Sequence, residues 1–403
     1  MRCSDLSAHG AAPQETPSPA PLTLSPRFRR LAAPETGRLA VQLTQGDEQC
    51  YPLYYFTPSL TQDGRFLIYH RSAARQLQLY RLDLETAESV QLTHATCEDT
   101  QWRPWCIDSG RGVLDHRSAL NVERDLVVYF DGNIAHAVHV RTLEDSVLFE
   151  IPADREAYGQ NCCTPDGRWF VYIHVPRGSV WGTPCTGAAV VAYDFDTGHQ
   201  QTLCQIDSAV FHVTAYDNQH FVVTHPSHGP GMLWTDLTSG RCSMLRDGVV
   251  HCPCTTRGIA YEVPAARRLG FMDPLARRSF EFPMPEQFQY IHTGWDPAGR
   301  LFLYENSTDW DRFDVHDIYV LVRLDQAGED TQWLRLTGSW PTCLGGQKAH
   351  FHPQVTSDRR WILFTGGDKA SQTCHMFLLD IADLADTQGI GLDMLRPMGG
   401  FES

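Results

Sequence analysis

The sequence predicts an all-β protein: a single-domain, seven-bladed β-propeller whose N-terminal strand closes the ring. Three observations predict this class. A loose unit of turn, strand, second strand, polar turn and third strand recurs along the chain, its copies are spaced by roughly 40 to 60 residues, and almost no helical periodicity lies between them. That spacing suits a four-stranded blade, and a ring of blades buries each sheet against its neighbours. An array of β-sandwiches is the alternative.

The recurring unit is clearest at residues 61–69, where Asp63-Gly64 is a hairpin signal and β-branched and aromatic residues follow. The segment from Leu77 onward alternates apolar and polar residues, which is typical of half-buried strands. The seven copies begin at Thr61, Glu123, Thr164, Tyr216, Thr255, Asp296 and Thr356. We expect one blade from each.

The two ends of the chain are predicted to lie outside the propeller, which we place at residues 36–385. Residues 1–35 are rich in proline and alanine and carry too little apolar surface to order themselves, so we expect a disordered tail. Residues 386–403 are expected to form a C-terminal tail. The strand Arg38–Thr44 is expected to complete the last blade and close the ring.

Composition excludes several classes of partner. With 403 residues, 42% hydrophobic and 11% aromatic, the chain can bury an extended core. Its net charge of −15 disfavours nucleic acid and anionic membranes as partners. The first thirty residues contain no apolar run, so neither a signal peptide nor a membrane anchor is expected, and we predict a cytoplasmic protein.

The chain contains 13 cysteines, an odd number without framework spacing, and they are expected to be free thiols. Two short clusters, Cys162-Cys163 and His251-Cys252-Pro253-Cys254, are alternative fragments of a zinc site. Neither has a second pair of ligands at finger-like spacing.

A candidate metal site surrounds His350 and His352. Residues two apart on a strand project from one face, so both imidazoles can meet one ion. Gln347 follows Gly345-Gly346 and could turn its amide oxygen toward the same point. Histidines hydrogen-bonded inside a channel are the structural alternative.

These residues resemble a known family. The run Gln347-Lys-Ala-His350-Phe-His352-Pro353, followed by Asp358 and WILFTG, is similar to the Gln-x-x-His-x-His pattern of the oligogalacturonate lyases. One unit upstream, His292-Thr-Gly-Trp-Asp-Pro-Ala-Gly299 resembles the remaining histidine segment of that family. The similarity extends thinly over residues 36 to about 382, including TGRLAVQLTQGD and the stretch from Cys50 to Gly64. It implies a shared fold.

The resemblance also implies a cofactor and a reaction. His292, Gln347, His350 and His352 would hold a divalent ion, which is Mn²⁺ in the family, and the substrate would be a short acidic oligosaccharide cleaved by β-elimination to a 4,5-unsaturated product. Such neutral donors leave the ion's charge uncompensated, so an anionic uronate carboxylate can bind there and its C5 proton becomes more acidic. His251 stands where the family has a histidine implicated in proton abstraction.

Substrate-binding candidates are less sharply marked. Tyr54 is retained from the family, His225 and His228 are alternatives to His251 as the base or belong to a loop, and Arg257 is a candidate cation. Two family motifs are replaced: His-Arg-Asn by Tyr51-Pro52-Leu53, and the basic residue before a Met-Trp pair by the segment Gly229–Trp234. Arg71, Arg103 and Arg117 are further possible replacements for the missing cations, and Trp102 and Trp105 could stack a sugar ring.

Two other functions fit the same sequence. A propeller that has lost two basic side chains could bind a ligand or protein without catalysis. A metal-dependent enzyme acting on a different acid sugar is the third reading, because the missing cations would weaken the hold on a polygalacturonate chain.

Overall fold

The computed structural model describes residues 20–98, 110–180, 185, 187–206, 212–225, 231–255, 257–288, 292–296, 299–307, 315–325, 331–341, 350–368, 371–385, 387 and 395–397. Strands dominate these ranges, and the helical elements among them are the 3₁₀ turns η1 (Pro264–Ala266) and η3 (Ala382–Leu384). Neither is long and apolar enough to cross a bilayer. The predicted all-β class is confirmed.

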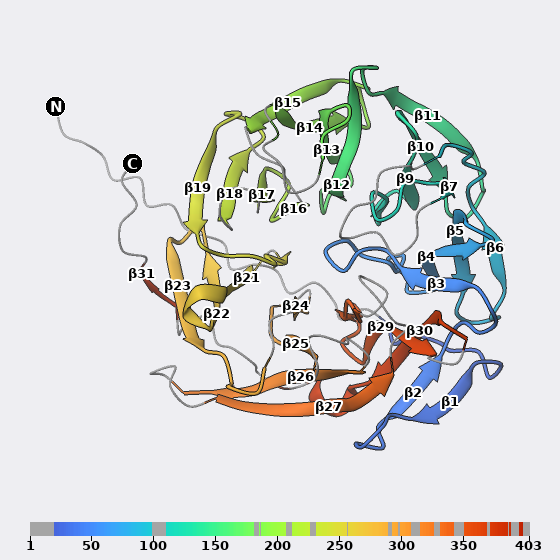
Figure 1. Ribbon diagram of the computed structural model, residues 1–403, viewed down its shortest axis with the longest axis vertical. Helices are drawn as coiled ribbons and strands as arrows, with labels where there is room; N and C mark the ends of the chain where they lie inside the picture. The colour runs from blue at the N-terminus through green and yellow to red at the C-terminus, as the bar shows by residue number, and fades with distance from the viewer. Residues whose placement is uncertain are drawn as a thin grey trace.

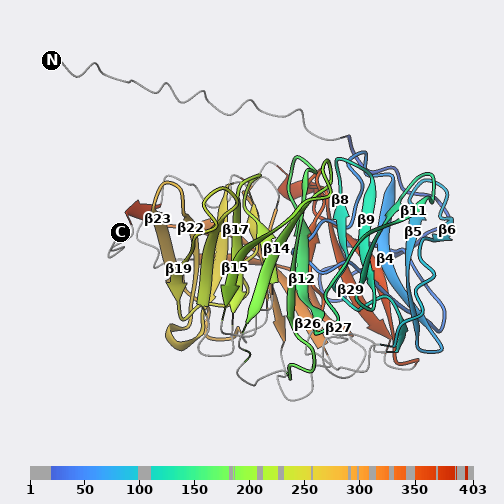
Figure 2. The same cartoon turned by 90° about the horizontal axis from the view of Figure 1, so that it is seen from above.

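The sheets stand side by side around a common centre, as in a propeller (Figure 1). Seen from the side, the strands run between the two faces of a thick disc (Figure 2). β12, β16 and β24 lie toward the centre, whereas β11, β15, β19 and β27 form the rim (Figure 1). Side chains on the central strands can therefore converge on the axis.

The sheets follow one another around the ring. The first contains β3 (Gln49–Pro52), β4 (Phe66–Ala73), β5 (Gln76–Asp83) and β6 (Ser89–Gln91), with β7 (Arg111–Gly112) parallel to β5. The second contains β8 (Ala119–Asn121), β9 (Leu126–Asp131), β10 (Ile134–His139) and β11 (Asp145–Glu150).

The third sheet has eight strands, in the order β15-β14-β13-β12-β16-β17-β18-β19. Its first half contains β12 (Arg155–Cys163), β13 (Trp169–Pro176), β14 (Ala188–Asp194) and β15 (Gln200–Ile206). Its second half contains β16 (His212–Ala215), β17 (His220–His225), β18 (Gly231–Asp236) and β19 (Cys242–Asp247). One parallel residue pair, Gln160 with His212, joins the halves, and each half is an antiparallel meander.

Three sheets complete the ring. One contains β20 (Cys254–Thr255), β21 (Gly258–Val263), β22 (Arg268–Asp273), β23 (Arg278–Pro283) and β31 (Arg396–Pro397). The next contains β24 (His292–Trp295), β25 (Phe302–Ser307), β26 (Val315–Leu324) and β27 (Thr331–Pro341). The last contains β28 (Gln354–Val355), β29 (Trp361–Asp368), β30 (Thr373–Asp380), β2 (Leu39–Gln42) and β1 (Arg29–Ala32).

A strand from the N-terminal part of the chain and a strand from its C-terminal part pair in this last sheet. β2 pairs antiparallel with β30, so that Ala40 lies opposite Leu379 and Gln42 opposite Phe377 (Figure 1). The strand expected to complete the last sheet thus occupies that place. β1 and β31 are short strands that lie outside residues 36–385.

Apolar side chains fill the spaces between neighbouring sheets. Phe130 of β9 and Phe170 of β13 are fully buried in one such layer, where Phe149 stacks on Tyr172 with ring centroids 4.8 Å apart. Aromatic side chains bury large areas and hold their rings in offset contacts, so each sheet needs its neighbour to cover its face.

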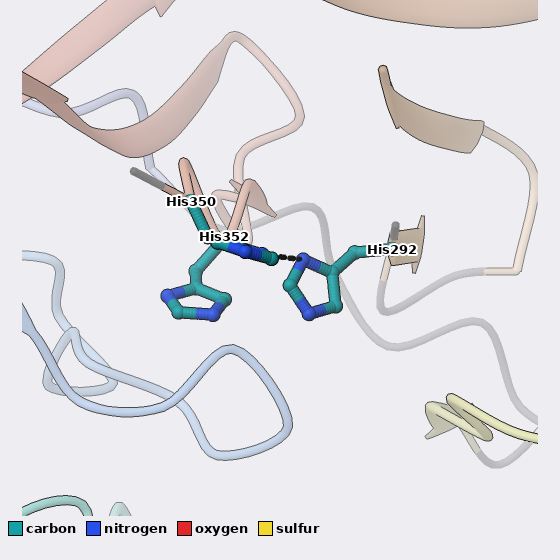
Figure 3. Close-up of side chains that lie close together, drawn as sticks. All are labelled: His292, His350 and His352. Atoms are coloured by element: carbon teal, nitrogen blue, oxygen red, sulfur yellow. Dashed lines mark hydrogen bonds between the residues drawn. The ribbon is translucent and has the colours of Figure 1, made fainter. Parts of the chain in front are cut away.

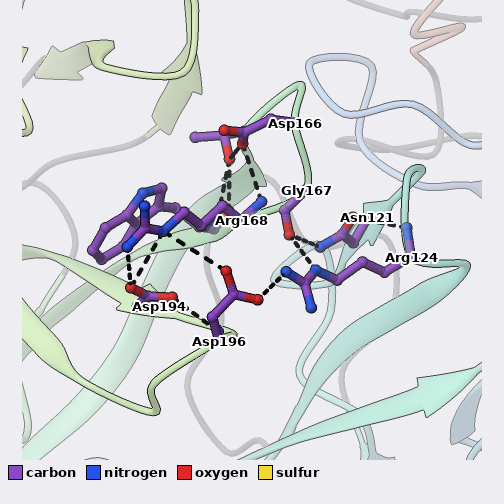
Figure 4. Close-up of polar contacts among 9 residues, drawn as sticks. Asn121, Arg124, Asp166, Gly167, Arg168, Asp194 and Asp196 are labelled. Carbon is purple, nitrogen blue, oxygen red and sulfur yellow. Dashed lines mark hydrogen bonds and ion pairs between the residues drawn. The ribbon is translucent and has the colours of Figure 1, made fainter.

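A polar contact also links neighbouring sheets, through the turn before β13 (Figure 4). The Thr164 hydroxyl donates to Asp166 Oδ1 at 2.6 Å, and Gly167 adopts φ +69°. The Gly167 carbonyl then accepts hydrogen bonds from Asn121 Nδ2 and Arg124 Nε of the preceding sheet, both at 2.8 Å. The Asp-Gly signal in the sequence therefore marks a junction between sheets as well as a hairpin.

Candidate metal centre

His292, His350 and His352, from two neighbouring parts of the ring, lie close together (Figure 3). His292 opens β24, and His350 and His352 lie in the irregular segment that precedes β28. One ring nitrogen of each lies within 4.8 Å of the others, and the rings of His292 and His352 are 4.8 Å apart between centroids. The structure thus brings together the three described histidines of the predicted metal site.

The segment around His350 and His352 differs from the regular strand that the sequence suggested. The backbone of His352 has φ +48°, which residues other than glycine rarely adopt. Phe351, between the two histidines, is fully buried. The reason lies in Glu305, whose carboxylate accepts the backbone N–H of Phe351 at 2.6 Å and of His352 at 3.2 Å. Those bonds replace the strand pairing of this segment.

Glu305 also orients the histidines. It lies opposite His292 in the β24–β25 pair, and His292 Nδ1 is 2.9 Å from Glu305 Oε2. His316 Nδ1 is 2.6 Å from the other carboxylate oxygen. His350 Nδ1 lies farther from His292 Nδ1, at 3.3 Å, so the carboxylate is the nearer acceptor for the His292 proton. The Nε2 atom of His292 is then the lone-pair nitrogen, as in carboxylate–histidine–metal sites.

Burial keeps these imidazoles neutral. It lowers the pKa of His292 to about 4 and holds the pKa values of His350 and His352 well below the ordinary value. Burial alone would raise the pKa of Glu305, but hydrogen bonds from His292 and His316 outweigh it and hold that pKa well below its usual range. The neutral imidazole is the form that binds a metal.

The candidate base, His251, lies next to the three histidines. Its ring is 4.7 Å from that of His292, and its backbone carbonyl accepts a hydrogen bond from Thr293 Oγ1 at 3.1 Å. Its Nδ1 lies 3.7 Å from Glu262 Oε2, a carboxylate with no exposed surface. Burial raises the pKa of Glu262, against the effect of His251. A partly exposed imidazole backed by a buried carboxylate is suited to accept a proton.

Aromatic rings also pack against the cluster. Tyr54 stacks on His212 at 5.3 Å and lies 5.0 Å from His352, and Tyr55 stacks on His352 at 5.4 Å. Burial raises the pKa of the Tyr54 hydroxyl, which therefore stays protonated and can donate a hydrogen bond. Tyr54 is thus beside the candidate metal ligands.

A cavity of about 680 Å³ opens close to this cluster. Its lining includes Tyr55, Gly294 and Pro353, which neighbour Tyr54, Thr293 and His352 in the chain. The volume is in the range that accommodates a small ligand.

Most of the remaining predicted residues lie away from the cluster or outside the described part of the chain. Gln347 and His228 lie outside the described residues, as do Trp102, Arg103 and Trp105, and only the backbone of His225, at the end of β17, is described. Arg257 is exposed in the turn between β20 and β21. Val250, which precedes His251, pairs with Glu262. Glu262 lies five residues after Arg257, so at 3.3 Å per extended residue this pair is roughly 16 Å from Arg257.

Sequence reasoning missed the residues behind the histidines. Glu305 and Glu262 sit in the apolar strands FLYENS and GIAYEV, and an acid in such a strand is a usable signal. It also missed a second cluster, His70, Asp115 and His116, whose donor atoms lie within 4.8 Å of one another. Nothing in the spacing of those residues links His70 to the other two.

The first cluster fits a divalent transition metal. Its imidazoles are neutral, and the buried Nε2 atom of His352 has no hydrogen-bond partner among the described residues. A buried nitrogen lone pair without a partner is costly and favours a ligand. The described cysteines are free thiols, as expected.

Comparison with known proteins gives consistent relatives. No protein-family model matches the chain. It is 21% identical over 372 residues to the oligogalacturonate lyase of Dickeya dadantii, covering 82% of this chain and 90% of that protein. It is 20% identical to the oligogalacturonide lyase of Pectobacterium atrosepticum with the same coverage.

Solved structures agree. An oligogalacturonate lyase in complex with manganese superposes with a TM-score of 0.71 at 20% identity, over 90% of this chain and 98% of that one. The oligogalacturonate lyase of Vibrio parahaemolyticus gives a TM-score of 0.69 at 19% identity, over 89% and 97%. The resemblance that the histidine motifs indicate is therefore confirmed: in sequence over most of its length, and in fold, this chain is similar to the oligogalacturonate lyases.

Proposed function

We propose that this protein is a metal-dependent lyase that cleaves short uronate chains of the oligogalacturonate type by β-elimination. The observation that carries the proposal is the convergence of neutral His292, His350 and His352 within 4.8 Å, beside His251 and its buried carboxylate partner. The similarity to a lyase solved with manganese supports Mn²⁺ as the ion.

The chain's own residues would divide the work as follows. His292, His350 and His352 hold the ion, and Gln347 is the fourth proposed ligand. When bound, the ion would neutralise the carboxylate of a uronate and acidify its C5 proton. His251 accepts that proton, and Glu262 holds the ring in position. The C4–oxygen bond then breaks as the C4–C5 double bond forms, and the leaving oxygen takes up a proton from His251 or from water to become the hydroxyl of the released sugar.

Substrate contacts complete the proposal. Tyr54 lies against His352 and supplies a protonated hydroxyl for the sugar. His225 and His228 are proposed to line the same binding site, and Arg257 to meet a more distant carboxylate of the chain. Neither nucleic acid nor membrane is proposed as a partner.

The number of blades and the bounds of the domain are also proposed. We propose seven blades, in which β12–β15 and β16–β19 count separately because one residue pair joins them. The propeller would span residues 36–385 as one domain, between an N-terminal and a C-terminal tail. A cytoplasmic location is proposed as well, and the free thiols support it.

The test is a product assay with metal control. Purified protein, stripped of metal and resupplied with Mn²⁺, should convert digalacturonate to a conjugated product that absorbs in the near ultraviolet. His251→Ala should lower kcat by roughly 100-fold or more while retaining bound metal, because proton abstraction of this kind contributes about 10²–10⁴-fold. His350→Ala/His352→Ala should lose both metal and activity.

The outcomes separate the alternatives. If the protein binds metal but converts a different acid sugar, the proposed substrate class is wrong. The mass of the product distinguishes elimination from hydrolysis, which adds water. Absence of metal and of product across several uronates would contradict the proposal and favour a propeller that only binds.

A further inference from the structure

We propose that His70, Asp115 and His116 form a second divalent-cation site beside the first. His70 lies on β4, and the other two residues lie between β7 and β8. Each offers one donor atom, and the three donors lie within 4.8 Å of one another. All three residues are fully buried, at 0%, 1% and 1% exposure, so this is no surface cluster of acids.

The histidine nitrogens are available to an ion. His70 Nδ1 is 3.4 Å from the backbone carbonyl oxygen of Pro52, to which it can donate, and this assigns the lone pair to Nε2. That Nε2 atom, and both ring nitrogens of His116, are buried without a hydrogen-bond partner among the described residues. A ligand histidine typically donates its other N–H to a carbonyl in this way, and buried polar atoms without partners need one.

Charge and protonation suit a cation. Burial lowers the pKa of His70 to about 4 and that of His116 to about 3, so both are neutral ligands near pH 7. Asp115 adds a negative charge, and the Tyr51 hydroxyl donates to its Oδ1 at 3.0 Å, which fixes the carboxylate. The Tyr51 ring also stacks on His70, 4.9 Å between centroids.

The backbone holds His116 in an uncommon conformation. Its φ is +55°, a left-handed conformation that is uncommon for a residue with a Cβ. The adjacent Arg117 is buried and donates from Nη1 to the backbone carbonyl oxygen of Asp115 at 3.4 Å. Its charge opposes a cation, and the Asp115 carboxylate offsets it. Two imidazoles and one carboxylate suit Zn²⁺, Mn²⁺, Fe²⁺ or Co²⁺.

The two clusters are neighbours. The ring of His116 is 5.9 Å from that of His352, and Tyr54 contacts both, at 5.2 Å and 5.0 Å. Two donors on one ion with bonds near 2.1 Å lie at most about 4.2 Å apart, and the donors of each cluster lie within 4.8 Å, close to that limit. The second site does not depend on the proposed lyase activity.

Metal counting tests the site. Chelator-treated wild type, His350→Ala/His352→Ala, His70→Ala/His116→Ala and the quadruple variant are titrated with Mn²⁺ and with Zn²⁺, using calorimetry and elemental analysis of the dialysed protein. We expect two, one, one and no ions per chain. Cobalt substitution should give two visible spectra in the wild type, one of which disappears in each double variant.

Folding is controlled separately. Asp115→Asn preserves the shape of the side chain. It should weaken the binding of the ion at the second site at least 10-fold and leave the circular dichroism spectrum unchanged. One ion in the wild type that is lost with His350 and His352 alone would overturn the second site and leave the lyase proposal standing. One ion lost with His70 and His116 alone would support the second site and remove the basis of the lyase proposal.

Discussion

At the scale of single residues, Glu305 organises the candidate metal centre without being one of its predicted ligands. It accepts hydrogen bonds from two imidazoles and two backbone N–H groups, which fixes the ring of His292 and the unusual backbone of His352. Such outer partners typically change metal affinity by 10–100-fold when mutated.

Glu305→Gln is therefore expected to weaken Mn²⁺ binding by about 10–100-fold. The glutamine keeps the length of the side chain, but its amide nitrogen cannot accept the bonds that one carboxylate oxygen now accepts. Isothermal titration calorimetry measures the change. Glu281→Gln is the matched control. Glu281 lies on the more exposed strand β23 and pairs with Arg246 of β19, so its substitution should leave metal affinity unchanged. Wild-type affinity in Glu305→Gln would exclude this role.

The sequence predicted the histidines of the site but not the acidic residues behind them. His292, His350, His352 and His251 came from motif and resemblance, and the structure brings them together. Glu305, 45 residues before His350, could be suspected only as an acid in an apolar strand. The approach of His70 to His116 follows from the packing of two neighbouring sheets, which one sequence does not encode as a local pattern.

At the scale of elements, the turn before the second strand of a sheet recurs with one geometry. A threonine hydroxyl donates to the aspartate two residues later in Thr61/Asp63, Thr164/Asp166 and Thr356/Asp358. At Gly167 the turn also contacts the preceding sheet (Figure 4). These turns set both the hairpin and the spacing between sheets.

Gly167→Ala should destabilise the protein more than Gly37→Ala does. Both glycines have φ +69°, so both variants pay the same backbone strain. A Cβ at Gly167 would lie 2.6 Å from Asn121 Oδ1 and 2.7 Å from Glu123 Cβ, whereas nothing lies within 4 Å at Gly37. Overpacking of this kind costs about 1–3 kcal/mol. Thermal unfolding midpoints measure it, and equal shifts would show that the contact between sheets adds nothing.

The ion pair that follows this turn should make the stability of the protein depend on pH in the acid range. Arg168 hydrogen-bonds to Asp194 Oδ2 at 2.9 Å and holds the pKa of that carboxyl below its ordinary value near 4. A lowered folded-state pKa stabilises the fold above pH 4, and this stability is lost as the pH falls through the folded pKa.

Stability of the wild type and of Asp194→Asn should therefore differ most near neutral pH and converge below pH 4. Urea unfolding at a series of pH values measures the difference. Asp47→Asn, at an exposed loop position, is the control substitution. A gap between wild type and Asp194→Asn that is the same at pH 3 and pH 7 would rule out the ion pair as its source.

At the scale of the whole molecule, the predicted repeats correspond to strands. The seven recurrent apolar segments form β4, β9, β13, β17, β21, β25 and β29, which are the second strands of successive meanders. Period-two alternation and turn signals were sufficient for this, because they act within a few residues. The single pair joining β12 to β16, and the short β1 and β31, depend on contacts between distant segments and were not predicted.

The pairing of β2 with β30 also constrains how the molecule is made. About 330 residues separate the two strands, so a chain leaving the ribosome exposes an unsatisfied strand edge until its last sheet has been synthesised. If the two ends of the chain were joined and new termini were placed in an exposed hairpin on the rim, β30 and β2 would be separated by the short strands β31 and β1 in place of about 330 residues. Such a permuted chain would bring these two strands together early in synthesis.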